Sequence, residues 1–181
     1  NSCKKEEEIP VKILVVSDSH GQTADLIRLK EKYAGKVDAM IHCGDSELEM
    51  SNPVLEGFTC VKGNCDFGAG FPNHIVKEIG GYRILVTHGH LYNVGINLNS
   101  LSYKSEEEQA KIALFGHTHK PVSGFGQDGV LYVNPGSISL PRGREERTYC
   151  ILGLSDGEIA VDFYEHDGTP VKSLSNTYQI E

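Results

Sequence analysis

Five short clusters of acidic, amide and imidazole side chains recur along the first two thirds of the chain. Carboxylate oxygens and imidazole nitrogens that gather in one place are ligands for divalent cations. These residue types therefore predict a metal site, and the chemistry that such a site favours is metal-assisted hydrolysis of phosphate esters. The clusters are Asp18-Ser19-His20, Gly44-Asp45, Gly63-Asn64-Cys65-Asp66, Thr87-His88-Gly89-His90 and Gly116-His117-Thr118-His119.

Each cluster follows a run of residues that is expected to form a β-strand. Residues i and i+2 of an extended segment point to the same side, so Asp18 and His20 are expected to direct their ligand atoms into one space. The same holds for His117 and His119. The preceding runs are Ile13-Leu14-Val15-Val16, Ala39-Met40-Ile41, the shorter Thr59-Cys60-Val61, Ile84-Leu85-Val86 and Ile112-Ala113-Leu114-Phe115.

The wider pattern is typical of an α/β protein. Strands are expected over residues 11–17, 37–43, 58–62, 75–79, 82–87 and 112–115. A helix is expected after Thr23, which would cap it, and Gly35 would end it. Residues 47–50 are a candidate start of a short helix, and residues 93–111 read as a loop that runs into a helix.

Two Asp-Gly pairs organise the last third of the chain. Asp128-Gly129 and Asp156-Gly157 each separate two β-rich runs, which is a strong hairpin signal because the turn needs positive φ. The first half therefore predicts βα units, and the last third predicts a meander of antiparallel strands. Two sheets packed face to face, with helices outside, are the α/β fold that fits both halves.

The length of 181 residues suits one domain. We expect a single domain over residues 11–181, preceded by a disordered leader over residues 1–10 that is not a signal peptide. Hydrophobic content of 39% and charged content of 23% are those of a soluble globular protein. No apolar stretch approaches the roughly 20 residues of a membrane-spanning helix, so no membrane partner is expected.

The net charge of −8, without a basic stripe, argues against strong binding to duplex nucleic acid, because few phosphates could be neutralised. A small phosphodiester substrate is compatible with this charge, since bound dications would offset it locally. The five cysteines include no Cys-x-x-Cys pair, which favours reduced thiols and a cytoplasmic location over disulfides or finger-type zinc. A homo-oligomer is left open.

The clusters provide ligands for two cations. Asp18 and His20 form one half-shell, and Asn64 with the later histidines forms the other. Asp45 follows the neighbouring strand between them and is the natural bridging ligand. This many imidazoles suits Mn, Fe, Zn, Ni or Co rather than Mg or Ca, and Mn is the metal that we expect first.

The order Asp-x-His, Gly-Asp, Gly-Asn-x-Asp, His and Gly-His-x-His resembles that of the calcineurin-like metallophosphoesterases. The Gly63-Asn64-Cys65-Asp66 form, the Thr87-His88-Gly89-His90 form and the small size are similar, more narrowly, to the compact bacterial and archaeal phosphodiesterases of that superfamily. The resemblance extends from Val11 to Phe163. It implies a four-layer α/β/β/α sandwich, in which two packed mixed sheets carry outer helices.

The resemblance also implies a set of metal ligands. Those that it assigns to one metal are Asp18, His20, Asp45 and His119. Those that it assigns to the other are Asp45, Asn64, His88 and His117. The nucleophile that it implies is water or hydroxide shared by the two metals.

Cys65 departs from the larger members of the superfamily, in which a histidine follows the asparagine and is thought to protonate the leaving oxygen. A thiol has a pKa of about 8.5 but hydrogen-bonds weakly, so Cys65 and His90 are both candidate catalytic acids. Candidate substrate contacts are Asn64 and Arg142. The turn at residues 134–137 either contributes backbone N–H groups to a phosphate or is a simple turn.

These observations lead to the hypothesis of a metal-dependent phosphodiesterase that hydrolyses small phosphodiesters. Two alternatives stay open. One is a phosphomonoesterase, and the other is a non-catalytic scaffold of the same fold, like the retromer subunit that resembles this family but has lost ligand histidines. The presence of all four histidines that the resemblance assigns as ligands, which are His20, His88, His117 and His119, favours an enzyme. His42, inside a strand, is expected to be a buried histidine with satisfied hydrogen bonds rather than a ligand.

Overall fold

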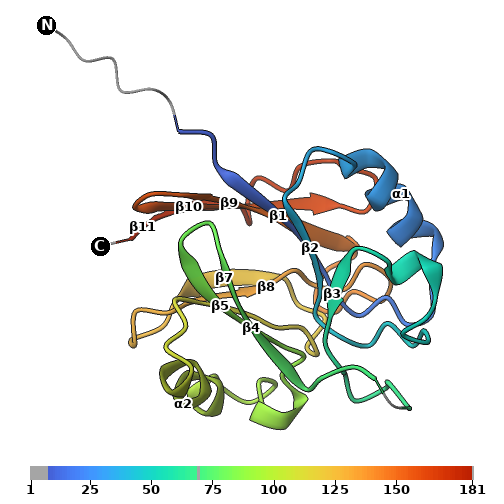
Figure 1. Ribbon diagram of the computed structural model, residues 1–181, viewed down its shortest axis with the longest axis horizontal. Coiled ribbons are helices and arrows are strands. Elements are labelled where there is room, and N and C mark those ends of the chain that lie inside the picture. Colours follow the sequence, from blue (N-terminus) through green and yellow to red (C-terminus); the bar gives the residue numbers. More distant parts are fainter. Residues whose placement is uncertain (1–7, 69, 181) are drawn as a thin grey trace, which may run out of the picture.

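The computed structural model describes residues 8–68 and 70–180 and contains two β-sheets that face each other (Figure 1). Of the leader expected over residues 1–10, residues 1–7 lie outside the described residues. Glu8 lies beside the β9–β10 turn, where its carboxylate accepts a hydrogen bond from the Asp156 N–H at 3.1 Å. Within the described ranges, no helix is long and apolar enough to cross a membrane.

The larger sheet has six strands in the order β11-β10-β9-β1-β2-β3. Strands β1, β2 and β3 are parallel to one another, and β9, β10 and β11 complete the sheet in antiparallel fashion. The strand bounds are β1 (Val11–Val16), β2 (Ala39–His42), β3 (Phe58–Cys60), β9 (Thr148–Ser155), β10 (Glu158–Glu165) and β11 (Asn176–Gln179).

The smaller sheet has five strands in the order β4-β5-β6-β8-β7. Its three central strands, β5, β6 and β8, are parallel, and β4 and β7 lie antiparallel at its two edges. The strand bounds are β4 (His74–Ile79), β5 (Tyr82–Thr87), β6 (Ile112–Leu114), β7 (Val122–Phe125) and β8 (Leu131–Asn134).

Three apolar clusters hold the layers together. The largest lies between the sheets, the second joins the six-stranded sheet to α1 (Ala24–Tyr33), and the third joins the five-stranded sheet to α2 (Asn99–Glu107). In β1, Ile13 and Val15 belong to the inner cluster, whereas Leu14 and Val16 belong to the outer one, because successive side chains of a strand point to opposite faces. The apolar run therefore marks a strand buried on both sides.

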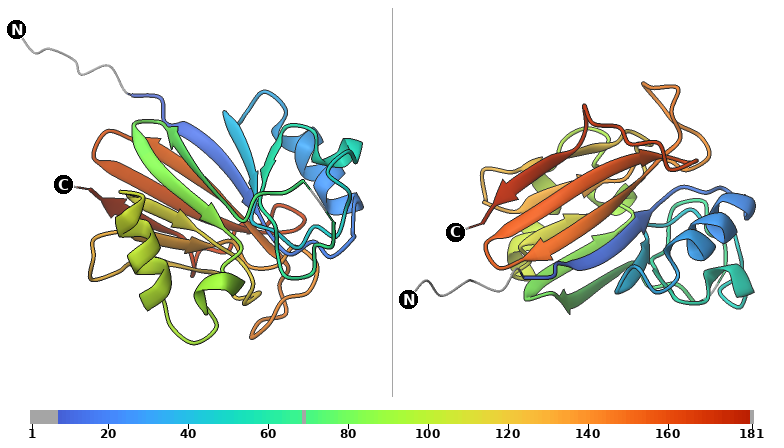
Figure 2. Two further views of the ribbon diagram at one scale, coloured as in Figure 1. Left: turned by 60° about the horizontal axis from the view of Figure 1, so that its bottom comes forward. Right: turned by 90° about the horizontal axis from the view of Figure 1, so that it is seen from above.

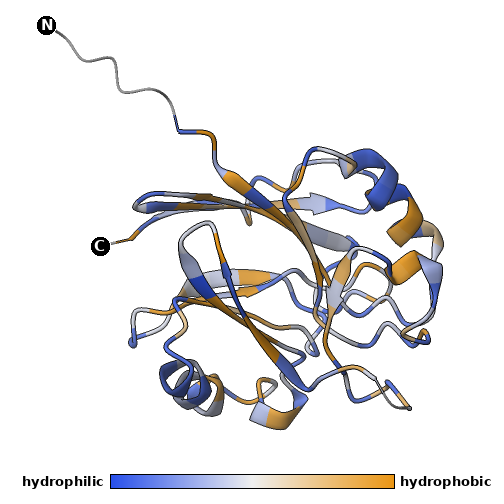
Figure 3. Cartoon of the chain, in the orientation of Figure 1, coloured by the Kyte–Doolittle hydropathy of each residue, from blue (hydrophilic) through white to orange (hydrophobic). Residues whose placement is uncertain are grey.

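The four layers α/β/β/α confirm the predicted fold. Figure 2 shows the two sheets stacked with a helix on each outer side, and Figure 3 shows hydrophobic residues along the strands between the helices. The predicted helix after Thr23 is present, although the Thr23 side chain makes no capping hydrogen bond. The helix begins instead with the Ile27 N–H donating to the Thr23 carbonyl at 3.0 Å.

The expected meander in the last third is wrong in one respect. Strands β7 and β8 form a hairpin in the five-stranded sheet, but β9, β10 and β11 belong to the six-stranded sheet. Strand β9 lies between β10 and β1, where almost all of its residues are buried. Its apolar residues are therefore covered in the six-stranded sheet, and β9 does not pair with the β7–β8 hairpin. The chain crosses between the sheets through residues 135–147.

The candidate helix at residues 47–50 is also absent. Glu47 has a left-handed φ of 54°, which ends helical geometry at the first of these residues. A short 3-10 helix, η1 (Pro53–Leu55), follows instead, with the Asn52 side chain accepting from the Val54 N–H at 3.0 Å. A second 3-10 helix, η2 (His90–Tyr92), and strand β11 were not predicted.

Candidate metal centre

The five clusters meet at one edge of the molecule. They follow β1, β2, β3, β5 and β6, and the carboxyl ends of parallel strands share one edge of a sheet. Hydrogen bonds join the two sheets at this edge. The His88 ring bonds through Nδ1 to the Cys43 carbonyl at 2.8 Å, and the His117 N–H donates to Asp18 Oδ2 at 3.2 Å.

The prediction that extended backbone directs each pair of candidate ligands into one space is wrong. The strands end before the ligands, and Asp18 and His20 have φ values of 54° and 47°, while His117 and His119 have 70° and 61°. Left-handed backbone at non-glycine residues is costly and gathers at functional sites. His117 and His119 also serve different parts of the site, since His117 faces Asn64 and His119 faces Asp18.

The glycines of the motifs let chain segments approach one another closely. A Cβ atom at Gly63 would overlap Oδ1 of Asp45, and one at Gly116 would overlap the Ser17 hydroxyl. Any larger residue at either position would displace a carboxylate or its hydrogen-bond donor. The glycine in each motif is therefore a requirement of the site geometry.

In both Asp18 and Asp45, one carboxylate oxygen accepts a hydrogen bond from a neighbouring residue and the other faces the histidines of the site. Asp18 Oδ2 accepts from the Ser17 hydroxyl at 2.5 Å, and Asp45 Oδ1 accepts from the Cys65 N–H at 2.8 Å. The remaining oxygens, Asp18 Oδ1 and Asp45 Oδ2, lie 3.7 and 3.2 Å from the same nitrogen, His88 Nε2. Both carboxylates are thus held rigidly with one oxygen available to a ligand.

Hydrogen bonds orient three of the histidines in the same sense. Nδ1 of His20 faces the Glu47 carboxylate at 2.5 Å, Nδ1 of His88 faces a carbonyl at 2.8 Å, and Nδ1 of His119 faces the Leu140 carbonyl at 2.6 Å. An oxygen acceptor holds the proton on Nδ1 and leaves the lone pair on Nε2. All three Nε2 atoms point into the site, which is the arrangement of metal-binding histidines.

The ligand atoms form two adjacent groups. In the first, His119 Nε2 lies 3.2 Å from Asp18 Oδ1 and 3.2 Å from His20 Nε2. In the second, Asn64 Oδ1 lies 3.0 Å from His88 Nε2 and 3.1 Å from His117 Nδ1. The structure therefore brings together all seven residues that were predicted as ligands, which are Asp18, His20, Asp45, Asn64, His88, His117 and His119.

Asp18 Oδ1 provides the test of whether these residues fit a metal. The side chain is fully buried, and among the described residues this oxygen has no partner with hydrogen-bond geometry. A buried carboxylate oxygen without a donor is costly. A cation bound among the facing imidazoles would satisfy it, and oxygen and imidazole donors in this mixture suit divalent metals. The site thus fits a divalent metal.

The neighbouring charges keep both carboxylates ionised. Burial alone would raise the pKa of Asp45, but His88 and the Cys65 N–H hold that pKa well below its ordinary value. The pKa of Asp18 is also lowered, because His119, His88 and the Ser17 hydroxyl outweigh the effect of burial. Ionised carboxylates are the form that binds cations.

The two candidate catalytic acids lie beside the second group of ligands. Burial and nearby carboxylates, Asp45 first among them, raise the pKa of the Cys65 thiol to about 11, which makes it a weaker acid than a free thiol. The His90 ring lies 5.4 Å from the His88 ring and 6.2 Å from the His117 ring. Burial and both neighbouring rings lower the pKa of His90.

The turn at residues 134–137 forms hydrogen bonds to two of the loops that carry candidate ligands. Asn134 is buried and donates through Nδ2 to the Gly116 carbonyl at 3.1 Å and to the Thr118 hydroxyl at 2.9 Å. The Ser137 hydroxyl donates to the Asp18 carbonyl at 2.8 Å. Arg142 is exposed, and its backbone N–H donates to the His119 carbonyl at 3.1 Å. The turn is thus built into the frame of the site.

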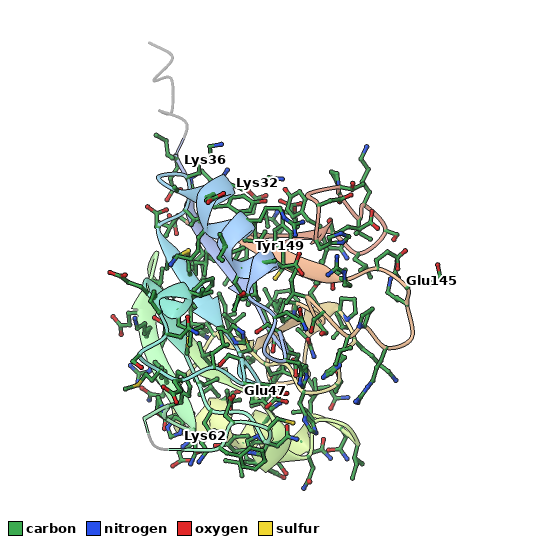
Figure 4. All side chains as sticks on the ribbon, turned by 90° about the vertical axis from the view of Figure 1, so that its right-hand side faces the viewer. Lys32, Lys36, Glu47, Lys62, Glu145 and Tyr149 are labelled. Carbon is green, nitrogen blue, oxygen red and sulfur yellow. The ribbon has the colours of Figure 1, made fainter. Side chains whose placement is uncertain are left out.

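Two residues that we did not single out from the sequence contribute to the site. Asp66 is buried and accepts three backbone N–H groups, from Asp45 at 2.9 Å, Gly63 at 2.8 Å and Glu47 at 2.9 Å. Glu47 (labelled in Figure 4) reaches His20 and lies in a group with His20 and Cys65 whose ligand atoms are within 4.8 Å of one another. Asp66 stands in a recognised cluster, but nothing in the sequence distinguishes Glu47 from neighbouring surface acids.

His42 is fully buried and both of its ring nitrogens have hydrogen-bond partners, as predicted. Its Nε2 lies 2.9 Å from the Ser19 hydroxyl, and its Nδ1 accepts from the Gly44 N–H at 3.1 Å. Burial lowers the pKa of His42 to about 4. The neutral ring therefore supports two of the ligand-bearing loops.

Proteins of known family share the sequence of this chain over most of its length. A model of the calcineurin-like phosphoesterase superfamily domain matches residues 11–157. The chain is 43% identical over 164 residues to the Bacillus subtilis protein named "Probable metallophosphoesterase YsnB", covering 91% of this chain and 96% of that protein. It is 28% identical over 178 aligned residues to phosphodiesterase YfcE of Escherichia coli, covering 82% of this chain and 89% of that protein.

A solved structure from Streptococcus pneumoniae, described as a predicted phosphoesterase, superimposes with a TM-score of 0.90 and 41% identity. The match covers 95% of this chain and 99% of that one. The family model spans most of the chain and includes all five clusters. The chain therefore belongs to the calcineurin-like phosphoesterase superfamily.

Proposed function

We propose that this protein is a phosphodiesterase that hydrolyses small phosphodiesters with the help of two divalent cations. The observation that carries the proposal is the position of Asp45. Its Oδ2 atom lies 3.2 Å from His88 Nε2 in one ligand group and 4.0 Å from His20 Nε2 in the other. One carboxylate can therefore serve both groups, which is what a shared ligand between two metals requires.

Each cation would have a distinct set of ligands. Asp18, His20 and His119 would hold the first, Asn64, His88 and His117 would hold the second, and Asp45 would complete both sets. When bound, the two cations would activate water as the nucleophile and stabilise the charge that develops on the phosphate in the transition state. Imidazole and carboxylate together suit Mn, Fe, Zn, Ni or Co, of which we propose Mn first.

The side chains of the protein would fix the geometry of the reaction rather than supply a strong acid. Hydrogen bonds to Glu47, Cys43 and Leu140 hold three histidines in place, so little reorganisation is needed when the substrate binds. Cys65, with its raised pKa, is a poor proton donor. His90 is the other candidate donor, but burial and the rings of His88 and His117 lower its pKa, which makes the protonated form harder to keep.

A diester substrate is supported by the phosphodiesterase name of the YfcE relative. The four candidate ligand histidines, which a scaffold that has lost its metal would not need, favour an enzyme over the non-catalytic alternative. Cys43, Cys60, Cys65 and Cys150 are free thiols, which fits a reducing compartment, and we propose the cytoplasm.

The experiment compares two substrates on one metal-loaded preparation. Protein is treated with chelator, dialysed, reloaded with Mn, and assayed with bis(4-nitrophenyl) phosphate and with 4-nitrophenyl phosphate. We expect faster turnover of the diester than of the monoester. We also expect His88→Asn to lower turnover by orders of magnitude, because the His88 ring lies beside the carboxylates of both Asp18 and Asp45. Glu31→Gln, an exposed change on α1, is the matched control and should keep full activity.

Two outcomes would replace the proposal. Faster turnover of the monoester would make the protein a phosphomonoesterase. Full metal loading without turnover of either ester would favour the scaffold. Metal loading is therefore measured on the same samples, so that an inactive preparation is not mistaken for an inactive protein.

A further inference from the structure

Two hollows flank the metal centre, and they carry opposite charge. The first, which we call the acidic pocket, has a volume of about 550 Å³, and the second, the basic pocket, about 510 Å³. Both volumes lie in the range of ligand sites, roughly 300–1,000 Å³. The acidic pocket is lined by Glu47, Leu48, Glu49, Met50, Ser51, Cys65, Asp66, Phe67, Gly68 and Phe71. The basic pocket is lined by Val94, Gly95, Leu98, Phe115, His117, Thr118, Lys120, Val122 and Arg142.

The lining charges decide which hollow can receive an anion. The acidic pocket has three carboxylates and no Lys or Arg, whereas the basic pocket has Lys120 and Arg142 and no Asp or Glu. In the described part of the chain, neither of these two cations forms an ion pair. In a protein of net charge −8, an acid-free pocket with two unpaired cations is a local exception that attracts anions.

The basic pocket is continuous with the metal centre through two segments. His117, a ligand of the second group, forms part of its wall, and Lys120 follows His119 directly in sequence. The backbone N–H of Arg142 donates to the His119 carbonyl at 3.1 Å, which places residue 142 beside the segment that carries His119. A phosphate held at the metal centre would thus have the two cations within reach of the group attached to it.

The other wall of the basic pocket is apolar. Val94 and Phe115 are 7% and 3% exposed and belong to the cluster beneath the five-stranded sheet. Leu98 and Val122 are more exposed and complete the wall. A flat ring or short hydrocarbon would bury apolar surface here, while an anionic substituent on it would meet Lys120 and Arg142.

We propose, on the basis of the phosphodiesterase function above, that the basic pocket binds one ester group of the substrate and selects an apolar group that carries a second negative charge. The substrate class is therefore a phosphodiester in which one alcohol component is an apolar ring or chain bearing a carboxylate or phosphate. The acidic pocket disfavours the same group by like-charge repulsion. The substrate would bind in one orientation.

The test uses three diesters with the same 4-nitrophenyl leaving group. Their second ester group is phenyl, 4-carboxyphenyl or 4-(trimethylammonio)phenyl, so the leaving group is the same and the charge of the second group differs. Each kcat/KM is divided by the rate constant of the uncatalysed reaction of the same diester, which corrects for the different electron withdrawal of the three groups. We expect kcat/KM of the Mn-loaded protein to be higher for the carboxylated diester than for the phenyl diester by about tenfold, or about 1.4 kcal/mol. The cationic diester should be the poorest of the three.

Charge reversal distinguishes selection from general damage. Lys120→Glu should lower the ratio of carboxylated to phenyl diester to one or below and raise the relative rate of the cationic diester. A misfolded variant would lose all three rates together and could not reverse a preference. Lys36→Glu, at the end of the molecule away from Glu47 in Figure 4, makes the same change of charge and should keep the tenfold ratio. Arg142→Ala is a second variant and should lower the ratio in the same direction.

A binding measurement separates failure of this proposal from failure of the phosphodiesterase function. Two phosphonate analogues that cannot be hydrolysed, differing only in the same carboxylate, are titrated into the Mn-loaded protein. Tighter binding of the carboxylated analogue, lost in Lys120→Glu, supports the pocket even if no diester is turned over. Equal binding of the two analogues, or equal kcat/KM for the anionic and neutral diesters, would overturn the pocket and leave the phosphodiesterase function standing.

Discussion

Asp66 provides the most direct test of how the ligand loops are held together. Its carboxylate accepts three backbone N–H groups, which belong to Asp45, Gly63 and Glu47. Two of these donors lie in the loop after β2, and the third precedes the ligand Asn64. Removal of this carboxylate should therefore loosen both loops at once.

The magnitude follows from the number of donors. A hydrogen bond to a charged group contributes about 1.5–3 kcal/mol, and a buried donor left without a partner costs about 1–3 kcal/mol. Asp66→Asn keeps one oxygen for the donors of Asp45 and Gly63 but turns an amide N–H₂ toward the Glu47 N–H. We expect a loss of about 2–4 kcal/mol for Asp66→Asn, and at least about 4 kcal/mol for Asp66→Ala, which abandons all three donors.

The assay is urea unfolding followed by circular dichroism in excess chelator, so that no bound metal contributes to stability. Asp38→Asn is the matched control, because exposed Asp38 accepts a single N–H, from Lys12 at 2.8 Å, and should cost less than about 1 kcal/mol. With Mn added, Asp66→Asn should also show a smaller rise in Tm than the unmodified protein. An Asp66→Asn variant with unchanged unfolding free energy and unchanged Mn response would show that the Asp66 carboxylate does not hold the two loops together.

Three further predictions concern neighbouring groups. Glu47→Ala should weaken Mn binding by about 10–100-fold, the usual effect of losing an acceptor behind a ligand histidine, as measured by Mn titration with Glu49→Ala as control. Burial lowers the pKa of His42 to about 4, so as pH falls the unfolded state binds this proton before the folded state does, and the protein should lose about 3 kcal/mol of unfolding free energy between about pH 6.5 and 4. Urea unfolding in chelator at several pH values should show a steeper fall of the unfolding free energy in the unmodified protein than in His42→Asn. With Cys65 a poor acid, kcat/KM should fall steeply as leaving-group pKa rises from aryl to alkyl diesters, and Cys65→His should flatten that slope.

Each of these predictions has a contrary result. Equal Mn affinity in Glu47→Ala and Glu49→Ala would show that the contact to His20 does not orient the ligand. A pH dependence of stability that is the same in His42→Asn would assign the acid loss to other groups. A flat leaving-group slope in the unmodified protein would reveal a competent acid, and a slope that becomes steep in His90→Ala would identify it as His90.

Much of the fold could be predicted because its central strands are buried on both faces. Ile13 and Leu14 are both buried, one toward each side of the sheet, and such strands appear in sequence as unbroken apolar runs. Strand β11 (Asn176–Gln179) was missed because it lies at the edge of its sheet and is mostly exposed, so neither alternation nor apolarity marks it. The crossing of the chain between sheets after β8 depends on long-range packing, which local patterns do not encode.

The ligand residues could be named because their types and their places after strands are local properties. The backbone that presents them was not predictable in the same way. Left-handed φ at Asp18 and Asp45 is disfavoured for these residues in isolation and is maintained by contacts from distant segments. The contact of Glu47 with His20 spans 27 residues, and the opposite charges of the two pockets arise only when Lys120 and Arg142 are brought to one wall.

The proposed phosphodiesterase activity requires two metals that share Asp45. The deciding measurement is the number of metal ions per chain, determined by elemental analysis and by native mass spectrometry on protein that was stripped with chelator, reloaded with Mn and freed of excess metal. We predict two ions per chain in the unmodified protein and at most one in Asp45→Ala, with His20→Ala and His117→Ala each retaining one. A single ion in the unmodified protein, or two ions retained in Asp45→Ala, would contradict the shared-carboxylate centre.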